Sequence, residues 1–214
     1  MPLVAPSMLS ADFLHLEKDI DMVNRHADLF HLDIMDGVFV PNISYGFPVV
    51  EAMARKAEKP LDVHLMIVQP ERYVERFAAA GADMLSFHLN ATDDPSSVLA
   101  QIRRCGMKAG LVINPDLPVE SLFPYVKECD FMMLMGVYAG FGGQKYIPET
   151  TARLRRLKDE ILRQGADVSL EVDGGVTLGN IKEIADAGVD IAVAGSTVFK
   201  AEDPTRAIEE LRCR

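Results

Sequence analysis

Short apolar runs recur along the chain at nearly regular intervals, and an amphipathic segment follows most of them. The runs are rich in Val, Ile, Leu, Met and Phe, as is typical of strands that are buried on both faces. The segments between them repeat apolar residues at helical spacing, and several begin at Pro or Asp and end at Gly. The pattern predicts strands over residues 3–7, 29–33, 61–65, 84–88, 108–114, 131–135, 168–173 and 191–195, and helices over residues 11–26, 48–59, 70–81, 95–106, 148–165 and 177–188.

Regular alternation of strands and helices predicts a parallel sheet. Eight strand–helix units in 214 residues average 214/8, or about 27 residues each, an ordinary length for such a unit. We therefore predict an α/β fold, a (β/α)8 TIM barrel that forms a single catalytic domain over residues 1–214. An open doubly wound sheet is the alternative, but Ser7 at the end of the first predicted strand is followed by MLSADF and not by a glycine-rich fingerprint.

Three of the predicted strands separate polar from apolar residues on their two faces. Side chains alternate along a strand, so one face of each of these strands is wholly apolar and the other carries polar groups. In a barrel the apolar face packs against the helices, and the polar face points into the interior. The inward residues are then His31, Asp33 and Met35 in the first, Asp62, His64 and Met66 in the second, and Ser169, Glu171 and Asp173 in the third.

Four of these inward side chains, His31, Asp33, His64 and Asp173, lie near the C-terminal ends of their strands. TIM barrels build their active sites at this end. Each residue alone would be interpreted as a buried structural group or half of an ion pair. Two imidazoles and two carboxylates at matching positions instead predict a divalent metal site of the zinc, iron or manganese kind. A bound cation would also supply the charge that makes burial of these groups tolerable.

Three further acidic residues lie near the predicted site. Asp62 and Glu171 are deeper on the same strand faces, and we interpret both as structural. Asp36 has the opposite parity and begins a loop, which predicts a capping or turn role.

Three methionines, Met35, Met66 and Met135, close their strands on the inward side. Core filling is the ordinary role of such residues. Here we expect them to form an apolar collar above the charged groups that keeps water away from a reacting carbon.

Glycine-rich stretches follow the last three predicted strands, with GFGGQ at 140–144, DGGV at 173–176 and AGS at 194–196. Glycine allows positive φ and close backbone approach, so successive N–H groups can form an anion-binding concavity. The loops after the last two strands of a TIM barrel often hold a phosphate at the N-terminus of a short helix, which STVFKAED at 196–203 could form. The segment GFGGQKY is also predicted to act as a mobile flap.

The formal net charge of −10 argues against nucleic acid or an anionic membrane surface as the main partner. An anionic substrate would then need a local positive site, which backbone amides can provide without lysines. The N-terminal MPLVAPSMLS has no basic leader, and no apolar run reaches bilayer length. The three cysteines, Cys105, Cys129 and Cys213, lack metal-type spacing, so we expect reduced thiols in a cytoplasmic protein.

Six motifs, in order and at barrel spacing, cover nearly the whole chain: PSMLSADF at 6–13, HLDIMDGVFVPNISYG at 31–46, PLDVHLM at 60–66, GFGGQKYIP at 140–148, EVDGGV at 171–176 and VAGSTVF at 193–199. Through these motifs the chain resembles the ribulose-phosphate 3-epimerase family. The resemblance implies a TIM-barrel isomerase of the pentose phosphate pathway with one divalent cation per subunit, Zn, Fe(II), Mn or Co. It also implies a sugar phosphate as substrate and a homo-oligomer, either a dimer or a hexamer.

The resemblance also assigns roles to individual residues. His31, Asp33, His64 and Asp173 would bind the metal, and Asp33 and Asp173 would also be the two acid–base groups. Ser7 and His64 would contact the sugar. The remaining implied contacts are substrate binding by Gly140, Phe141, Gly142, Gly143, Gly174, Gly175, Gly195 and Ser196, and pocket lining by Met35, Met66 and Met135.

The chain departs from the family pattern at two places. Members commonly have Asn-Pro-Gly before FGGQ, whereas this chain has Tyr138-Ala139-Gly140, and many have His-x-Glu where it has His88-Leu89-Asn90. The nearest alternative activity is that of D-allulose 6-phosphate 3-epimerase. Its members tend to vary in the GFGGQ and DGG loops, whereas both loops have the pentose form in this chain, which favours a pentose phosphate.

Two other classes of protein are less consistent with the sequence. A metal-dependent hydrolase barrel typically has a His-x-His pair on its first strand, where this chain has only Ser7. A non-catalytic sugar-phosphate-binding barrel would have little use for two carboxylates at one metal.

Overall fold

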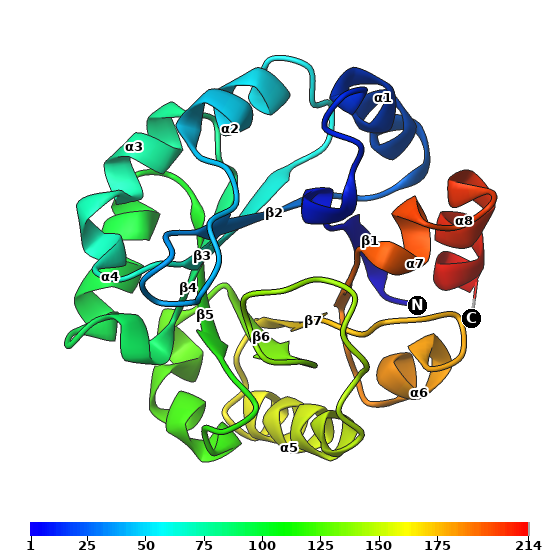
Figure 1. Cartoon of the computed structure of the whole chain (residues 1–214). Coiled ribbons are helices and arrows are strands. Elements are labelled where there is room, and N and C mark those ends of the chain that lie inside the picture. The colour runs from blue at the N-terminus through cyan, green and yellow to red at the C-terminus, as the bar shows by residue number, and fades with distance from the viewer. Residues whose placement is uncertain (214) are drawn as a thin grey trace.

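A computed structural model of the chain describes residues 1–213, and its parallel strands form a ring surrounded by helices (Figure 1). Neighbouring strands pair in the order β1-β8-β7-β6-β5-β4-β3-β2, and a parallel bridge between Ser7 and His31 closes the ring between β1 and β2. This is the predicted (β/α)8 barrel. The strands are β1 Leu3–Pro6, β2 Phe30–Met35, β3 Leu61–Met66, β4 Met84–His88, β5 Lys108–Ile113, β6 Phe131–Met135, β7 Ser169–Asp173 and β8 Ile191–Ala194.

Every predicted helix overlaps an observed one, although residues 70–81 form two helices, and two short 3-10 helices at 8–10 and 89–91 were not predicted. The larger differences are the following. The β5–β6 connection contains a 3-10 helix, η4, that was not predicted. It contains Pro124, which has no N–H to donate to the backbone hydrogen bonds of an α-helix, so the residues form 3-10 turns. The C-terminal helix α8 was not predicted either, and STVFKAED forms only the four-residue α7. The helices are η1 Met8–Ser10, α1 Leu16–His26, α2 Phe47–Ala54, η2 Pro70–Arg72, α3 Val74–Ala79, η3 Leu89–Ala91, α4 Pro95–Arg104, η4 Val119–Glu128, α5 Glu149–Arg163, α6 Ile181–Asp186, α7 Ser196–Phe199 and α8 Pro204–Cys213.

The barrel interior changes from apolar to charged along its axis. At the N-terminal end of the strands a plug of side chains fills the ring, and Phe131 is part of it. A Cβ at Gly110 would lie 2.3 Å from the Phe131 ring, so glycine makes the room that this plug needs. One step toward the C-terminal ends, His31, Asp62 and Glu171 are fully buried inside the ring. The plug comprises Leu29, Met84, Phe131 and Ile191, together with Ala5 and Val193, of which Val193 also reaches the pocket at the opposite end.

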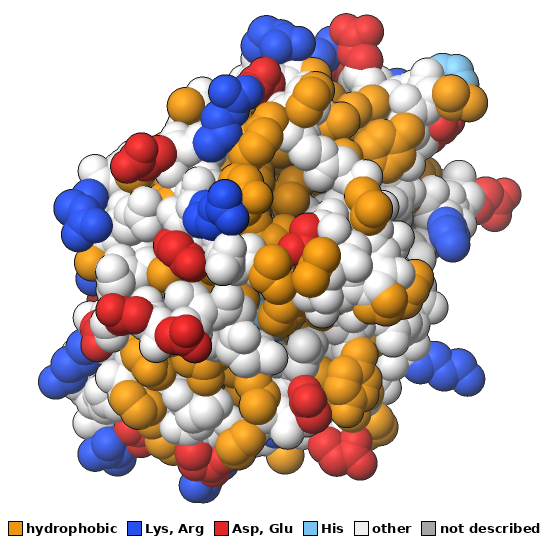
Figure 2. All heavy atoms as spheres, turned by 60° about the vertical axis from the view of Figure 1, so that its left-hand side comes forward, with side chains coloured by type: hydrophobic (Ala, Val, Ile, Leu, Met, Phe, Trp, Pro, Cys, Tyr) orange, Lys and Arg blue, Asp and Glu red, His pale blue; other side chains and the backbone are white. Residues whose placement is uncertain are grey.

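The outer surface carries charges of both signs. Figure 2 shows acidic and basic side chains interspersed on the side of the barrel that α3 and α4 cover, with hydrophobic side chains gathered between them. No helix in the described part of the chain is long and apolar enough to cross a membrane. Since the chain has an acidic excess of ten charges, an anion would have to be bound by a local site and not by the overall field.

Candidate active site

Four donor atoms converge inside the C-terminal end of the barrel. They belong to His31 and Asp33 on β2, His64 on β3 and Asp173 on β7, and they all lie within 4.8 Å of one another. The Nε2 atom of His31 is 3.5 Å from Asp33 Oδ1 and 3.9 Å from Asp173 Oδ2. The Nδ1 atom of His64 is 3.4 Å and 3.7 Å from the same two oxygens. The structure therefore brings together the four residues that the sequence pattern singled out.

This donor set fits a divalent cation. The His31 Nε2 and His64 Nδ1 atoms are buried and have no hydrogen-bond partner among the described residues, so each offers a free position to the cluster. Ligands about 2.0–2.1 Å from a tetrahedral metal would be separated by about 3.4 Å. The separations between the imidazole nitrogens and the carboxylate oxygens, 3.4–3.9 Å, are close to that value.

The two imidazoles are each held from behind by a second side chain. Asp62 Oδ2 lies 2.6 Å from His31 Nδ1, and His88 Nε2 lies 2.9 Å from His64 Nε2. An N–H···O bond to Asp62 places the His31 proton on Nδ1 and leaves Nε2 free for a metal. The deep carboxylate that the sequence assigned to structure therefore orients a candidate ligand. His88 was not singled out by the strand pattern, although it has the same inward parity at the end of β4.

The electrostatics of the two candidate acid–base groups differ. Burial alone would raise the pKa of Asp33, but the neighbouring imidazoles of His31 and His64 outweigh it and lower that pKa below its usual range. Burial, with the charge of Asp33 second, raises the pKa of Asp173 to about 6. Two carboxyl groups in one cluster are therefore biased toward opposite protonation states.

The acidic groups around His31 are partly neutralised by the positive charge of that imidazole. Burial alone would lower the pKa of His31, but Asp62 and then Asp33 raise it well above its usual value. Burial, followed by the charge of Asp62, raises the pKa of Glu171, whose Oε1 lies 3.5 Å from His31 Nδ1. A protonated His31 thus neutralises part of the acidic cluster, and a divalent cation would replace that proton on binding.

Ser7 and a loop after β2 fix the position of Asp33. The Ser7 hydroxyl donates to Asp33 Oδ2 at 2.6 Å. The Ser44 hydroxyl accepts from Met35 N–H and donates to the Asp33 carbonyl oxygen. Asp36 caps the start of this loop, because its Oδ1 accepts the N–H groups of Val38 and Phe39, each at 2.8 Å, which confirms the predicted turn role.

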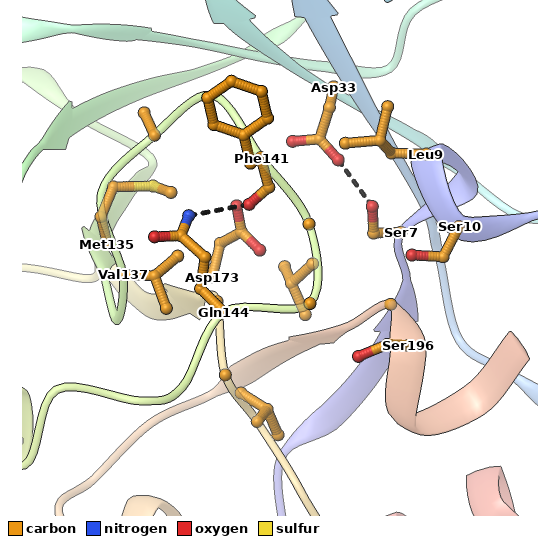
Figure 3. A pocket seen from close by; sticks show the side chains of 18 of the residues that line it. Ser7, Leu9, Ser10, Asp33, Met135, Val137, Phe141, Gln144, Asp173 and Ser196 are labelled. Atoms are coloured by element: carbon orange, nitrogen blue, oxygen red, sulfur yellow. Dashed lines mark hydrogen bonds between the residues drawn. The ribbon is translucent and has the colours of Figure 1, made fainter. Parts of the chain in front are cut away.

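A pocket opens above the cluster, and its lining includes Asp33 and Asp173 but neither Lys nor Arg. Figure 3 shows the side chains of Asp33 and Asp173 facing this pocket, with Ser7 and Ser10 on one side and Met135 and Val137 on another. Of the residues that the resemblance implicates, Ser7, Asp33, Met35, Met66, Met135, Gly140, Phe141, Gly142, Gly143, Asp173, Gly174, Gly175, Gly195 and Ser196 line the pocket.

Two predicted site residues lie just outside this pocket. His31 and His64 are fully buried and are not part of the pocket lining, but both lie within 4 Å of the carboxyl groups of Asp33 and Asp173, which are. The predicted sugar contact of His64 is thus a proposal that the pocket lining does not itself support. The sequence interpretation missed Ser10, Thr177 and Thr197, three hydroxyl residues of the lining that have no distinctive spacing.

The segment 140–144 arches over the pocket and is tied down by side-chain amides. Asn42 donates to the Gly140 carbonyl oxygen at 2.8 Å, and Gln144 donates to the carbonyl oxygens of Tyr138 and Phe141. Ala139 stands where many relatives in the resemblance have proline, and its N–H donates to Asn114 Oδ1 at 3.1 Å. A proline could not make this bond. Alanine at position 139 thus allows a hydrogen bond to Asn114 that fixes the start of the segment.

The loops after β7 and β8 expose backbone to the pocket. Gly174 and Gly175 have φ of +106° and +71°, which bend the chain sharply after Asp173. The helix α7 begins at Ser196, so the first N–H groups of that helix have no intrahelical acceptor. Backbone amides are therefore available for an anion in a lining that holds no cationic side chain.

Replacing Gly175 with Ala should destabilise the protein by about 1–3 kcal/mol. A Cβ there would lie 2.4 Å from the backbone nitrogen of Tyr146, and the positive φ would be strained in addition. Gly106→Ala is the matched control, because φ is +83° but no atom lies within 4 Å of the added Cβ. Urea unfolding of both variants measures the difference, and equal losses would show that the close approach at Gly175 has no effect on stability.

A parallel barrel with two carboxyl groups facing one pocket at the C-terminal ends of its strands is the arrangement of a TIM-barrel enzyme. The chain belongs to the ribulose-phosphate 3-epimerase family, because the model of the "Ribulose-phosphate 3 epimerase family" matches residues 3–199. A relative named ribulose-phosphate 3-epimerase from Synechocystis sp. is 46% identical over 98% of this chain and 92% of its own length. Relatives with the same name from Escherichia coli and Mycobacterium bovis are 43% and 42% identical, over 98% and 99% of this chain and 94% and 92% of their own lengths.

Solved structures of lower identity show the same fold. A mutant tryptophan synthase α-subunit from Pyrococcus furiosus superposes with a TM-score of 0.75 at 16% identity, over 99% of this chain and 98% of its own. A 3-hexulose-6-phosphate synthase superposes with a TM-score of 0.71 at 17% identity, over 100% and 99% of the two chains. At such identities the likeness supports the barrel architecture alone.

Proposed function

We propose that this protein is a ribulose-phosphate 3-epimerase, which interconverts D-ribulose 5-phosphate and D-xylulose 5-phosphate. The observation that carries the proposal is the position of two carboxyl groups, Asp33 on β2 and Asp173 on β7, at one donor cluster and on the lining of one pocket. The curated relatives over nearly the whole chain support the same activity. A non-catalytic binding barrel would not need such a pair.

The reaction requires a proton to leave C3 on one face of the sugar and another to arrive on the opposite face. The C3 proton lies α to the C2 ketone, so its removal gives a planar enediolate. Asp33 and Asp173 come from strands that are not neighbours, so their carboxyl groups can approach C3 from two sides. One carboxylate accepts the proton while the other carboxylic acid donates, and the roles exchange in the reverse direction.

The donors that would hold a divalent cation are His31 Nε2, Asp33 Oδ1, His64 Nδ1 and Asp173 Oδ2. Such a cation supplies positive charge that stabilises the enediolate oxygens and makes the C3 proton removable near neutral pH. Ser7 holds Asp33 in place through the 2.6 Å hydrogen bond to its second oxygen.

The rest of the pocket would bind the substrate and exclude water. Backbone amides near Gly174, Gly175, Gly195 and Ser196 would hold the phosphate, which explains how an acidic protein takes an anionic substrate. The buried methionines surround the space above the acids and keep it apolar, which strengthens the electrostatic interactions there. They are Met35, Met66 and Met135.

The substrate is tested by comparing kcat/KM for D-ribulose 5-phosphate and D-allulose 6-phosphate with the metal-loaded protein. We expect the pentulose to be preferred by at least about tenfold, a difference of about 1.4 kcal/mol in transition-state stabilisation. A higher kcat/KM for the hexulose phosphate would assign the chain to the sister activity. No turnover of either sugar would contradict the proposed epimerase function.

A further inference from the structure

Behind the donor cluster, two histidine rings face each other edge to edge. His64 and His88 are both fully buried, on the adjacent strands β3 and β4. Their Nε2 atoms lie 2.9 Å apart, and the rings are nearly parallel, with an interplanar angle of 28°. The other nitrogen of His64, Nδ1, points at Asp33 and Asp173. His64 therefore lies between the cluster and His88.

Two imidazole nitrogens at this distance must share one proton, because two lone pairs would repel and two N–H groups would clash. If the proton is on His64 Nε2, His88 accepts it and the Nδ1 lone pair of His64 is free for a cation. If the proton is on His88 Nε2, the neutral His64 carries its own proton on Nδ1 and cannot be a ligand there. The direction of one hydrogen bond thus decides whether His64 can bind a metal.

The His88 ring also contacts a second aromatic ring. Phe39, from the loop after β2, lies against it with ring centroids 4.8 Å apart and an interplanar angle of 45°. Phe39 is in turn held by the hydrogen bond from its N–H to Asp36. The His88 ring thus contacts both His64 and Phe39, and its Nε2 lies 2.9 Å from His64 Nε2, whereas its Nδ1 is buried and has no hydrogen-bond partner among the described residues.

We propose that His88 is a positioning residue whose Nε2 accepts the His64 Nε2–H and so presents the His64 Nδ1 lone pair to a divalent cation. This inference rests on the metal site of the proposed function. It goes beyond the four donors, because His88 is neither one of them nor a residue of the pocket lining. Side chains that orient a metal-binding imidazole in this way typically change metal affinity by about 10–100-fold when they are lost.

The test is the affinity of the purified, metal-stripped protein for Co2+, followed by the visible absorption of the bound ion. His88→Phe keeps an aromatic ring against Phe39 but removes the acceptor, so its Kd should rise by about 10–100-fold. His88→Gln places an amide oxygen near the former Nε2 and should bind Co2+ within about threefold of wild type. Wild-type affinity in His88→Phe, or equal losses in both variants, would overturn the proposal.

A second measurement needs no substitution. In the Zn2+-loaded wild-type protein, nitrogen-15 spectra of the histidine rings should show an unprotonated Nε2 and a protonated Nδ1 for His88. The reverse tautomer would overturn the proposal even if the variants failed to fold. Neither readout uses turnover, so an inactive protein with the expected Co2+ affinities would contradict the proposed epimerase activity while leaving the role of His88 supported.

Discussion

Replacing Asp173 with Asn should leave a folded barrel that, assayed with the divalent cation in excess, epimerises D-ribulose 5-phosphate more slowly by about three orders of magnitude or more. The amide has the size of the carboxyl group but cannot take or give the C3 proton. Stability should not fall, because burial and Asp33 already raise the pKa of Asp173 and make its charged form unfavourable. The rate of xylulose 5-phosphate formation measures the loss.

Exchange of the C3 proton with solvent deuterium separates the role of Asp173 from that of Asp33. Since Asp33 remains, the Asp173→Asn variant should still exchange the C3 proton of one of the two sugar phosphates with D2O, without converting it to the other. Asp186→Asn, which removes an exposed carboxylate paired with Lys182 on α6, is the matched control and should keep the wild-type rate. A near-normal rate in Asp173→Asn would remove Asp173 from the chemistry.

The barrel itself was predictable because its signal is repeated along the chain. Each strand is a short segment with at least one wholly apolar face, and the alternation of such segments with helical ones is compatible with few folds other than a parallel α/β barrel. One missed helical segment lacks this clarity, whereas the other, α8, begins at Pro204 and carries the same amphipathic signal as the predicted helices. In η4, Pro124 interrupts the helical pattern, and the chain forms 3-10 turns that a periodicity of 3.6 does not describe.

The donor cluster was predictable because strand parity is strict. Every second residue of a strand points into the barrel, and this rule alone places His31, Asp33, His64 and Asp173 on the inside. The structure brings their four donor atoms within 4.8 Å of one another. The contacts behind the cluster could not be counted in that way. The pairing of His64 with His88 depends on the side-chain rotamers of two strands and on Phe39 from a distant loop, none of which a local pattern encodes.

Removing the metal should abolish the activity. Three carboxyl groups lie within 3.5 Å of His31 and favour retention of its proton when no cation is bound. Without the cation, the enediolate also loses the positive charge that would stabilise it. We expect the rate of the stripped protein to fall by at least about a hundredfold, on the scale of a lost electrostatic stabiliser in an active site. Circular dichroism should show an unchanged fold.

The most direct measurement is therefore metal analysis of the purified protein, combined with a xylulose 5-phosphate assay before chelation, after chelation and after return of one divalent cation per chain. The account predicts about one bound metal, loss of the rate on stripping, and recovery when Zn2+, Fe2+, Mn2+ or Co2+ is added. A stripped protein that works at full rate would contradict the claim that one cation holds these four side chains around the reacting carbon.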